Sequence, residues 1–310
     1  MEFNKIIIIP VRILFFFLII TTLSFLLINY APSSPVEILT FQRFGTIQGE
    51  DEEELIKEFA LDRPFYIRYI LWLKNAASLN FGRSVTSGES AIWEVFSRYK
   101  YTAILTLVAS TIMVSFAFIL ALLQIYSKYK IISYTALLLP ITLNSIPVFW
   151  LGLLLLYIFS IKLNLFPLSG GSGPLSIVLP SISLSTVQIL YYTRLVKSIL
   201  KESTNREYVE FAVAYGLGRR LTFFHYIAKP AIIPIINALG VTICILFSGA
   251  PIVETVFNWN GIGRLVVSAI LARDYPVIQA SITVIGATVL LISILIDIFT
   301  LAFDPRFRKE

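Results

Sequence analysis

Residues 103–126 read AILTLVASTIMVSFAFILALLQIY, without a single Asp, Glu, Lys or Arg. A helix needs about 20 mostly apolar residues to cross the hydrocarbon core of a bilayer. Five further stretches meet this requirement: 13–30, 134–159, 176–196, 231–253 and 277–301. The first could also be a secretory signal, but its apolar run exceeds the usual core of about 7–15 residues and no clear cleavage site follows. The sequence therefore predicts an all-α integral membrane protein with six transmembrane helices.

The composition agrees with this expectation. Of the 310 residues, 57% are hydrophobic and only 14% are charged, against about 25% charged residues in a typical soluble domain. A disordered chain is excluded as well, because so much apolar surface cannot stay solvated. The net charge of +6 would suggest nucleic acid in a soluble protein. In a membrane protein it reflects basic residues on the cytoplasmic side, so we expect no nucleic-acid partner.

Several kinds of chemistry lack the residues that they need. The chain has one Cys, Cys244, and one His, His225, which argues against a disulfide framework and a His-based metal site. No G-x-x-x-x-G-K-[ST] loop is present, and the glycine-rich stretch 170–173 lacks the Lys that such a loop requires. We therefore expect neither an enzyme nor a bound metal or cofactor.

The distribution of charge predicts three regions and their orientation. Region 1–30 holds a short N-terminus and the first span, and region 102–310 holds the other five spans with a polar loop at 197–229. Lys and Arg gather in the short loops on one side, which places both termini and the 197–229 loop in the cytoplasm. Region 31–101 then faces outside. It holds ten acidic residues and two expected amphipathic helices, near 52–60 and 64–79; the acidic residues are Glu37, Glu50, Asp51, Glu52, Glu53, Glu54, Glu58, Asp62, Glu89 and Glu94.

The 197–229 loop contains a short helix with its own start and stop signals. Thr204 and Glu207 have the S/T-x-x-E spacing of a capping box, and Gly216 fits the left-handed position that ends a helix. Between them, one face carries residues at i, i+3, i+4 and i+7, namely Tyr208, Phe211, Ala212 and Tyr215. Such an exposed face could rest on lipid or enter a protein groove.

This loop resembles the E-A-A-x-x-x-G loop of permease subunits in binding-protein-dependent ABC importers, with Glu210, Ala212 and Gly216 matching and Phe211 in place of the other Ala. The chain looks most like the first, B-type permease of the dipeptide/oligopeptide importers. Short motifs in the expected order carry the likeness along nearly the whole chain: Ala31–Pro35, Leu61–Pro64, Phe81–Ser84, Pro147–Gly152, Phe166–Gly170, Gly261–Arg264, Ala272–Pro276 and Asp304–Arg306.

The resemblance implies the type I importer fold, in a bacterial or archaeal cell membrane. It implies a second, homologous permease that completes the translocation path, two cytoplasmic ATPase subunits and an external solute-binding protein. The short helix would be the coupling helix, docking an ATPase through Thr204, Glu207, Tyr208, Glu210, Phe211, Ala212, Tyr215 and Gly216. Polar residues in the spans, Asn144, Ser145 and Gln188, could line the path or bond neighbouring helices.

The substrate class stays open at this point. The family likeness favours di- or oligopeptides, while oligosaccharides or another small solute remain alternatives. A stand-alone secondary transporter is a rival, but the spans hold few ionisable groups of the kind that couple ion flow. Two prolines at the start of the fifth span, Pro230 and Pro234, could bend the helix there, or be tolerated without a bend as prolines are in other membrane helices.

Overall fold

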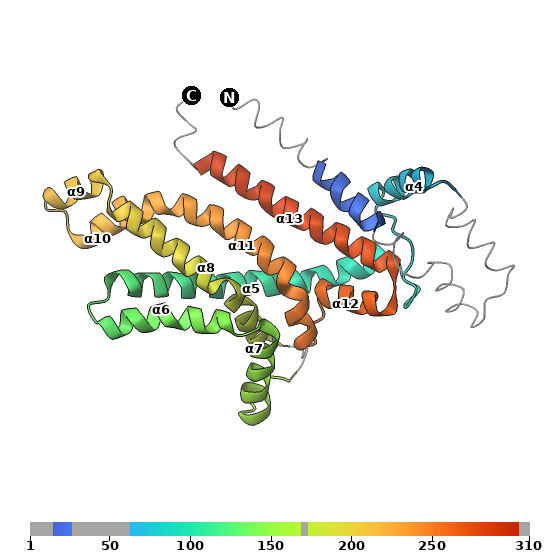
Figure 1. The fold of residues 1–310 in the computed structure, drawn as a ribbon, viewed down its shortest axis with the longest axis horizontal. Helices are drawn as coiled ribbons and strands as arrows, with labels where there is room; N and C mark the ends of the chain where they lie inside the picture. Colours follow the sequence, from blue (N-terminus) through green and yellow to red (C-terminus); the bar gives the residue numbers. More distant parts are fainter. Residues whose placement is uncertain (1–14, 27–62, 169–172, 304–310) are drawn as a thin grey trace. The chain divides into compact units, whose positions relative to one another are not determined.

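The computed structural model describes residues 15–26, 63–168 and 173–303. The chain divides into two compact units: Met1–Tyr101 with Asn260–Leu290, and Thr102–Trp259 with Leu291–Glu310. We refer to them as unit 1 and unit 2. Within the described ranges the chain is helical, and its extended pairing is limited to one isolated bridge, between Arg83 and Ser90 (Figure 1).

The labelled elements are all helices or helical turns. In chain order they are α4 (Phe65–Ala77), α5 (Ala91–Tyr126), α6 (Lys130–Ser145), α7 (Val148–Leu155), the π-helical turn η1 (Leu156–Lys162), the 3₁₀ turn η2 (Pro174–Ile177), α8 (Val178–Thr204), α9 (Glu207–Ala214), α10 (Arg219–Leu221), the π-helical turn η3 (Thr222–Ala228), α11 (Lys229–Val256), α12 (Ile262–Ala272) and α13 (Tyr275–Phe303).

The described residues contain four helical runs long and apolar enough to cross a membrane, or five if one bent pair counts as a span. The four correspond to the expected spans at 103–126, 176–196, 231–253 and 277–301. Of the expected span at 13–30, the structure describes a helix over Phe15–Leu26, and the rest lies outside the described residues. The helix is not broken at Pro230 and Pro234, because α10, η3 and α11 form one helical run over Arg219–Val256.

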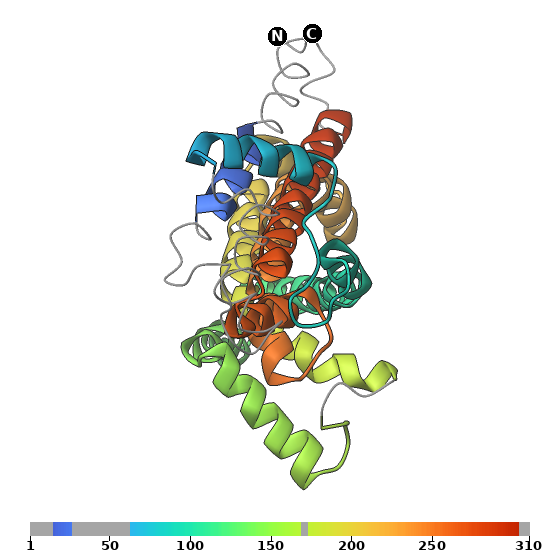
Figure 2. The same cartoon turned by 90° about the vertical axis from the view of Figure 1, so that its right-hand side faces the viewer.

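The third expected span, 134–159, is not the single straight helix that its apolar length predicted. It consists of α6 and the α7–η1 run, which are bent by 101° relative to each other (Figures 1 and 2). Ile146 lies between them with an extended backbone, φ −91° and ψ 127°. Pro147 causes this, because its ring disfavours a helical conformation at the preceding residue. Length and hydropathy do not report such a break.

Unit 2 is built around α8, which packs against α6, α7 and α11. Two close approaches hold its helices together. Tyr192 of α8 is fully buried, and its hydroxyl donates a 2.9 Å hydrogen bond to the carbonyl oxygen of Ile235 in α11. Gly240 of α11 lies so close to α13 that a Cβ atom there would come within 1.4 Å of Ile296 Cδ1. Small residues at such contacts allow membrane helices to approach closely.

Unit 2 also buries an acidic side chain that the sequence pattern placed beyond the fifth span. Glu254 lies in the last turn of α11 and is 0% exposed. The Thr102 hydroxyl of α5 donates a 2.6 Å hydrogen bond to Glu254 Oε1. Trp259 donates its backbone N–H to the Glu254 carbonyl oxygen at 2.8 Å. A buried carboxyl group is costly without a hydrogen-bond partner, and the Thr102 hydroxyl supplies one, so this contact joins the end of α11 to α5.

Unit 1 has its own apolar core, formed by side chains from α4, the start of α5, α12 and the start of α13. The helix α4 confirms the second of the two expected amphipathic helices, while the first, near 52–60, lies outside the described residues. The helix α12 was not expected. Its signal is visible in hindsight, because Ile262, Leu265, Val266 and Ala269 have the i, i+3, i+4, i+7 spacing of a helix face and contribute to this core.

Candidate functional site: the short helix between α8 and α11

The helix α9 lies between the two long helices α8 and α11, but it does not begin with the expected capping box. Thr204 is the last residue of α8, and its hydroxyl donates to the Leu200 carbonyl at 2.8 Å within that helix. Arg206 is the residue before α9, and no side chain caps the helix there. The prediction was wrong because α8 extends further than its apolar pattern indicated, so that Thr204 satisfies its hydroxyl on its own helix. Glu207 is the first residue of α9, at the positive end of the helix dipole.

The end of α9 confirms the stop signal. Gly216 has a φ of +76°, in the left-handed region that favours glycine. Its N–H donates to the Val213 carbonyl at 3.0 Å, and the Leu217 N–H donates to the Ala212 carbonyl at 3.2 Å. These two bonds form a Schellman motif, which satisfies the last carbonyl groups of the helix. The direction in which the chain leaves α9 is therefore set by Gly216.

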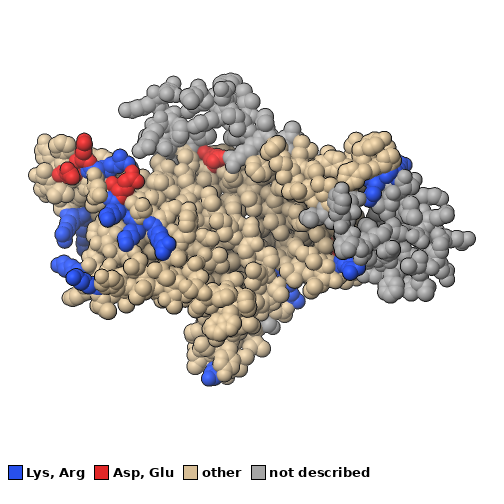
Figure 3. Space-filling view, in the orientation of Figure 1, with Lys and Arg blue, Asp and Glu red and all other residues tan. Residues whose placement is uncertain are grey.

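The surroundings of α9 carry both signs of charge. Lys and Arg side chains gather at the end of unit 2 that carries α9 and α10, and acidic side chains lie among them (Figure 3). Residues 197–229 hold six basic and three acidic side chains. Arg206 and Glu202 form an exposed ion pair at 2.5 Å, which contributes little to stability. Glu210 is exposed on α9 and stays available to a partner.

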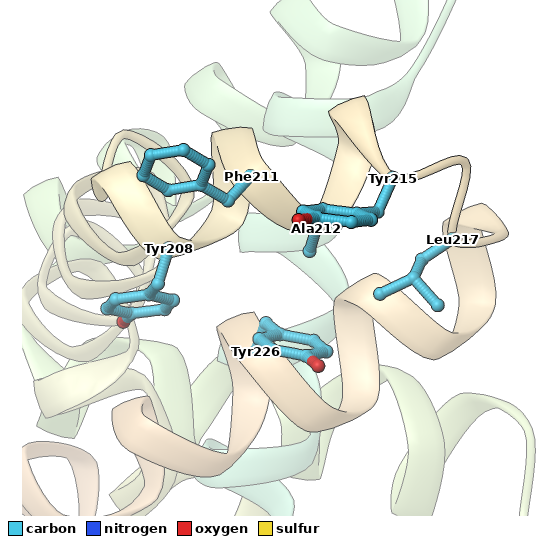
Figure 4. Close-up of a pocket in the computed structure, with 6 residues that line it drawn as sticks. All are labelled: Tyr208, Phe211, Ala212, Tyr215, Leu217 and Tyr226. Carbon is cyan, nitrogen blue, oxygen red and sulfur yellow. The ribbon is translucent and has the colours of Figure 1, made fainter.

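An apolar groove of about 420 Å³ lies between α9 and the segment that follows it. The four residues of the expected face all line it, together with two residues further along; the six are Tyr208, Phe211, Ala212, Tyr215, Leu217 and Tyr226. In Figure 4, Tyr226 of η3 faces the side of α9 that carries Tyr208 and Ala212. The expected face is thus present, and Tyr226 and Leu217 are members of the groove that the sequence pattern missed.

Burial divides α9 into an anchored side and an exposed side. Val209 and Ala212 are only 4% and 5% exposed, because α9 packs against η3. Phe211 and Tyr215 are 65% and 85% exposed. Large aromatic side chains at such exposure are typical of a surface that a partner or a lipid interface covers. Small Ala212 is an anchor and does not itself present an open contact surface.

The three residues considered for the translocation path lie on two helices that pack together. Asn144 and Ser145 are exposed in the last turn of α6, directly before the break, and Gln188 is half-buried in α8. The Ser145 hydroxyl donates to the Ile141 carbonyl of its own helix at 2.9 Å. No hydrogen bond joins these three side chains in the described part of the chain. Their assignment to the path stays a prediction.

The described residues contain no group of three or more His, Cys, Asp or Glu side chains arranged to hold a metal ion. The motifs Ala31–Pro35 and Asp304–Arg306, and all of the acidic residues of region 31–101 that precede α4, lie outside the described residues.

Comparisons with known proteins agree along most of the chain. The dipeptide transport system permease protein DppB of Escherichia coli K12 is 28% identical over 326 residues, covering 95% of both chains. The di/tripeptide transport system permease protein DppB of Pseudomonas aeruginosa UCBPP-PA14 is 28% identical and covers 94% of both. The oligopeptide transport system permease protein AppB of Bacillus subtilis 168 is 30% identical and covers 93% of this chain and 94% of the relative.

Solved structures show that the fold is shared more widely. The crystal structure of an amino acid ABC transporter with histidines matches 69% of this chain and 94% of its own, with a TM-score of 0.52 at 19% identity. The inward-facing MetNI methionine ABC transporter matches 68% of this chain and 94% of its own, with a TM-score of 0.51 at 17% identity.

The family model described as the inner membrane component of binding-protein-dependent transport systems matches residues 113–309, which include α9 and its groove. This chain is an all-α, multi-pass membrane permease subunit, and it belongs to the family of binding-protein-dependent transport system inner membrane components.

Proposed function

We propose that this chain is the permease subunit of a peptide importer and encloses half of the translocation path. One observation carries the proposal: relatives named as dipeptide, di/tripeptide and oligopeptide permeases align with it over more than nine-tenths of its length. A second, homologous permease completes the path, an external solute-binding protein delivers the peptide, and lipid surrounds the complex. The chain has no ATPase site of its own, so two cytoplasmic ATPase subunits supply the energy.

The helix α9 is the docking site for one ATPase subunit. The exposed aromatic side chains of Phe211 and Tyr215 supply apolar contact area, and exposed Glu210 supplies a charge for a basic partner group. The Schellman motif at Gly216 and the buried pair Val209 and Ala212 hold the helix at a defined angle. Motion of the ATPase then passes through α9 into α8 and α11.

The proposed orientation places α9 and both termini in the cytoplasm. Region 31–101 faces outside, and region 102–310 forms the permease core with its cytoplasmic loop at 197–229. The distribution of Lys and Arg supports this orientation, because short loops rich in these residues stay on the cytoplasmic side.

The transport proposal is tested by reconstitution of the complete complex in vesicles, with the ATPases, the second permease and the binding protein. We expect ATP-dependent uptake of labelled di- and oligopeptides, and no uptake when this chain is present alone. Uptake of labelled oligosaccharides without peptides would assign the substrate to the other class. Uptake by the isolated chain, driven by an ion gradient, would identify a secondary transporter and overturn the proposal.

The docking role is tested with a matched pair of substitutions on α9. Phe211→Ala removes a ring that lines the groove, while Val213→Ala truncates a side chain that is equally exposed, at 60%, but does not line it. We expect the ATPase to co-purify about tenfold less with Phe211→Ala, because interface aromatic side chains often contribute more than 1 kcal/mol. Equal recovery of the ATPase with both variants would contradict docking on this face.

A further inference from the structure

A polar junction joins three helices of unit 2 near the end of α8 that precedes α9. Gln124 of α5 is at its centre. Its side-chain Nε2 donates to the Ala136 carbonyl oxygen of α6 at 2.9 Å, and its Oε1 accepts from Lys197 Nζ of α8 at 3.0 Å. A fourth residue, Ser133 of α6, donates its hydroxyl to the Gln124 carbonyl oxygen at 3.4 Å.

The sequence of α6 explains why a donor is needed at this position. In an α-helix the Ala136 carbonyl would accept from the N–H of residue 140, and residue 140 is Pro, which has no N–H. Ala136 and Pro140 are both buried, so this carbonyl would otherwise lack a partner away from water. The amide of Gln124 supplies the missing donor.

This contact fixes the orientation of the Gln124 amide. Only the NH₂ group can donate to a carbonyl, so Oε1 is the atom that remains for a second partner. Lys197 fills that role, and in the described part of the chain no carboxylate forms an ion pair with it. A half-buried cation on α8 is therefore held by an amide whose other end is fixed to the proline-interrupted helix α6.

We propose that Lys197 and Gln124 are positioning residues that transmit displacement of α8 to the α5–α6 hairpin. Lys197 lies seven residues before Thr204, about 10 Å along a continuous helix, so movement of α9 reaches it directly. The junction then passes that movement to α6, the helix that leads to the 101° break. This inference rests on the proposed function, because it assumes that ATPase motion enters through α9.

The test uses the reconstituted complex with its ATPases, second permease and peptide-loaded binding protein. Lys197→Met removes the donor and keeps an unbranched side chain that is only one heavy atom shorter. Lys197→Arg retains an N–H donor toward Gln124. Lys201→Met is the matched control, since Lys201 lies one turn further along α8, is exposed, and makes no contact of this kind. The readout is the amount of peptide taken up per ATP hydrolysed.

For Lys197→Met we expect normal assembly, ATP hydrolysis within about twofold of wild type, and about fivefold less uptake per ATP, an effect within the range reported for residues along coupling networks. Lys197→Arg should restore most of the ratio, and Lys201→Met should leave it unchanged. If Lys197 had only a structural role, its loss would lower the protein level, ATP hydrolysis and peptide uptake together, without changing the uptake per ATP.

A second variant covers failure of Lys197→Met to assemble. Gln124→Glu keeps an acceptor for Lys197 but loses the donor to the Ala136 carbonyl, so it should lower the ratio as well. A wild-type ratio of peptide uptake to ATP hydrolysis in Lys197→Met would overturn the proposed coupling role of the junction. If only Gln124→Glu assembles, a wild-type ratio in that variant would overturn it instead. If Phe211→Ala still loses the ATPase in that case, the proposed function stands and only the proposed coupling role of the junction is wrong. If Phe211→Ala binds the ATPase normally, the failure belongs to the docking role.

Discussion

The Ser84 hydroxyl donates a 2.5 Å hydrogen bond to Asp274 Oδ2, although the two residues are 190 positions apart in the sequence. Both are buried in unit 1, at 4% and 2% exposure. The same carboxylate oxygen accepts the Thr86 backbone N–H at 3.2 Å, and Oδ1 accepts the Val277 N–H at 3.4 Å. Asp274 therefore fastens the loop before α5 to the start of α13.

Removal of this contact should destabilise unit 1. Ser84→Ala leaves a buried carboxylate with one partner fewer, which costs about 1–3 kcal/mol of unfolding free energy. We expect faster proteolysis of the loop before α5 in the purified complex. Ser97→Ala is the control, because Ser97 is exposed and bonds only its own helix. Identical cleavage rates in the two variants would show that the carboxylate does not hold the loop.

Gly216→Val should misdirect α9 while leaving the membrane helices folded. A β-branched residue at φ +76° is strained by about 1–3 kcal/mol. Gly218→Val is a strict control, since Gly218 has a φ of −62° and a Cβ atom at either glycine meets no atom within 4 Å. We expect peptide-stimulated ATP hydrolysis to fall only in Gly216→Val, at equal protein level. A similar decrease in both variants would contradict a role for the left-handed backbone.

The orientation can be read from thiol labelling of intact cells in a Cys244→Ser background. A cysteine at Glu89, in the proposed external region, should react with a membrane-impermeant maleimide. A cysteine in place of Gly218 should react only after the cells are permeabilised. The reverse labelling pattern would place the 197–229 loop outside and exclude ATPase docking on α9.

The buried pair Thr102 and Glu254 should be sensitive to removal of the hydroxyl. Thr102→Val keeps the shape of the side chain but leaves Glu254 Oε1 without this donor, at a cost of about 1–3 kcal/mol. Thr102→Ser should restore most of the loss. Thr111→Val is the control, because the exposed Thr111 hydroxyl bonds only the Leu107 carbonyl of α5. Thermal unfolding of the purified complex measures the difference, and equal stability of Thr102→Val and Thr111→Val would show that the hydroxyl is dispensable.

The sequence alone predicted what depends on local composition and local geometry. Long apolar runs identified α5, α8, α11 and α13, because a helix that spans a bilayer must be about 20 apolar residues long. The end of α9 followed from Gly216, since few other residues adopt its backbone conformation. Ordered short motifs identified the family, and each of these features can be read within a window of a few turns.

Only the tertiary structure decided which distant groups meet. The core position of α12 and the partners of Asp274 and Glu254 depend on helices that approach from elsewhere in the chain. Gln124 illustrates the reason. Its sequence position predicts nothing, because its role arises from a carbonyl left free by Pro140 on one helix and a cation on another. Hydrogen bonds and burial act over a few ångströms, and folding alone brings such groups within that distance.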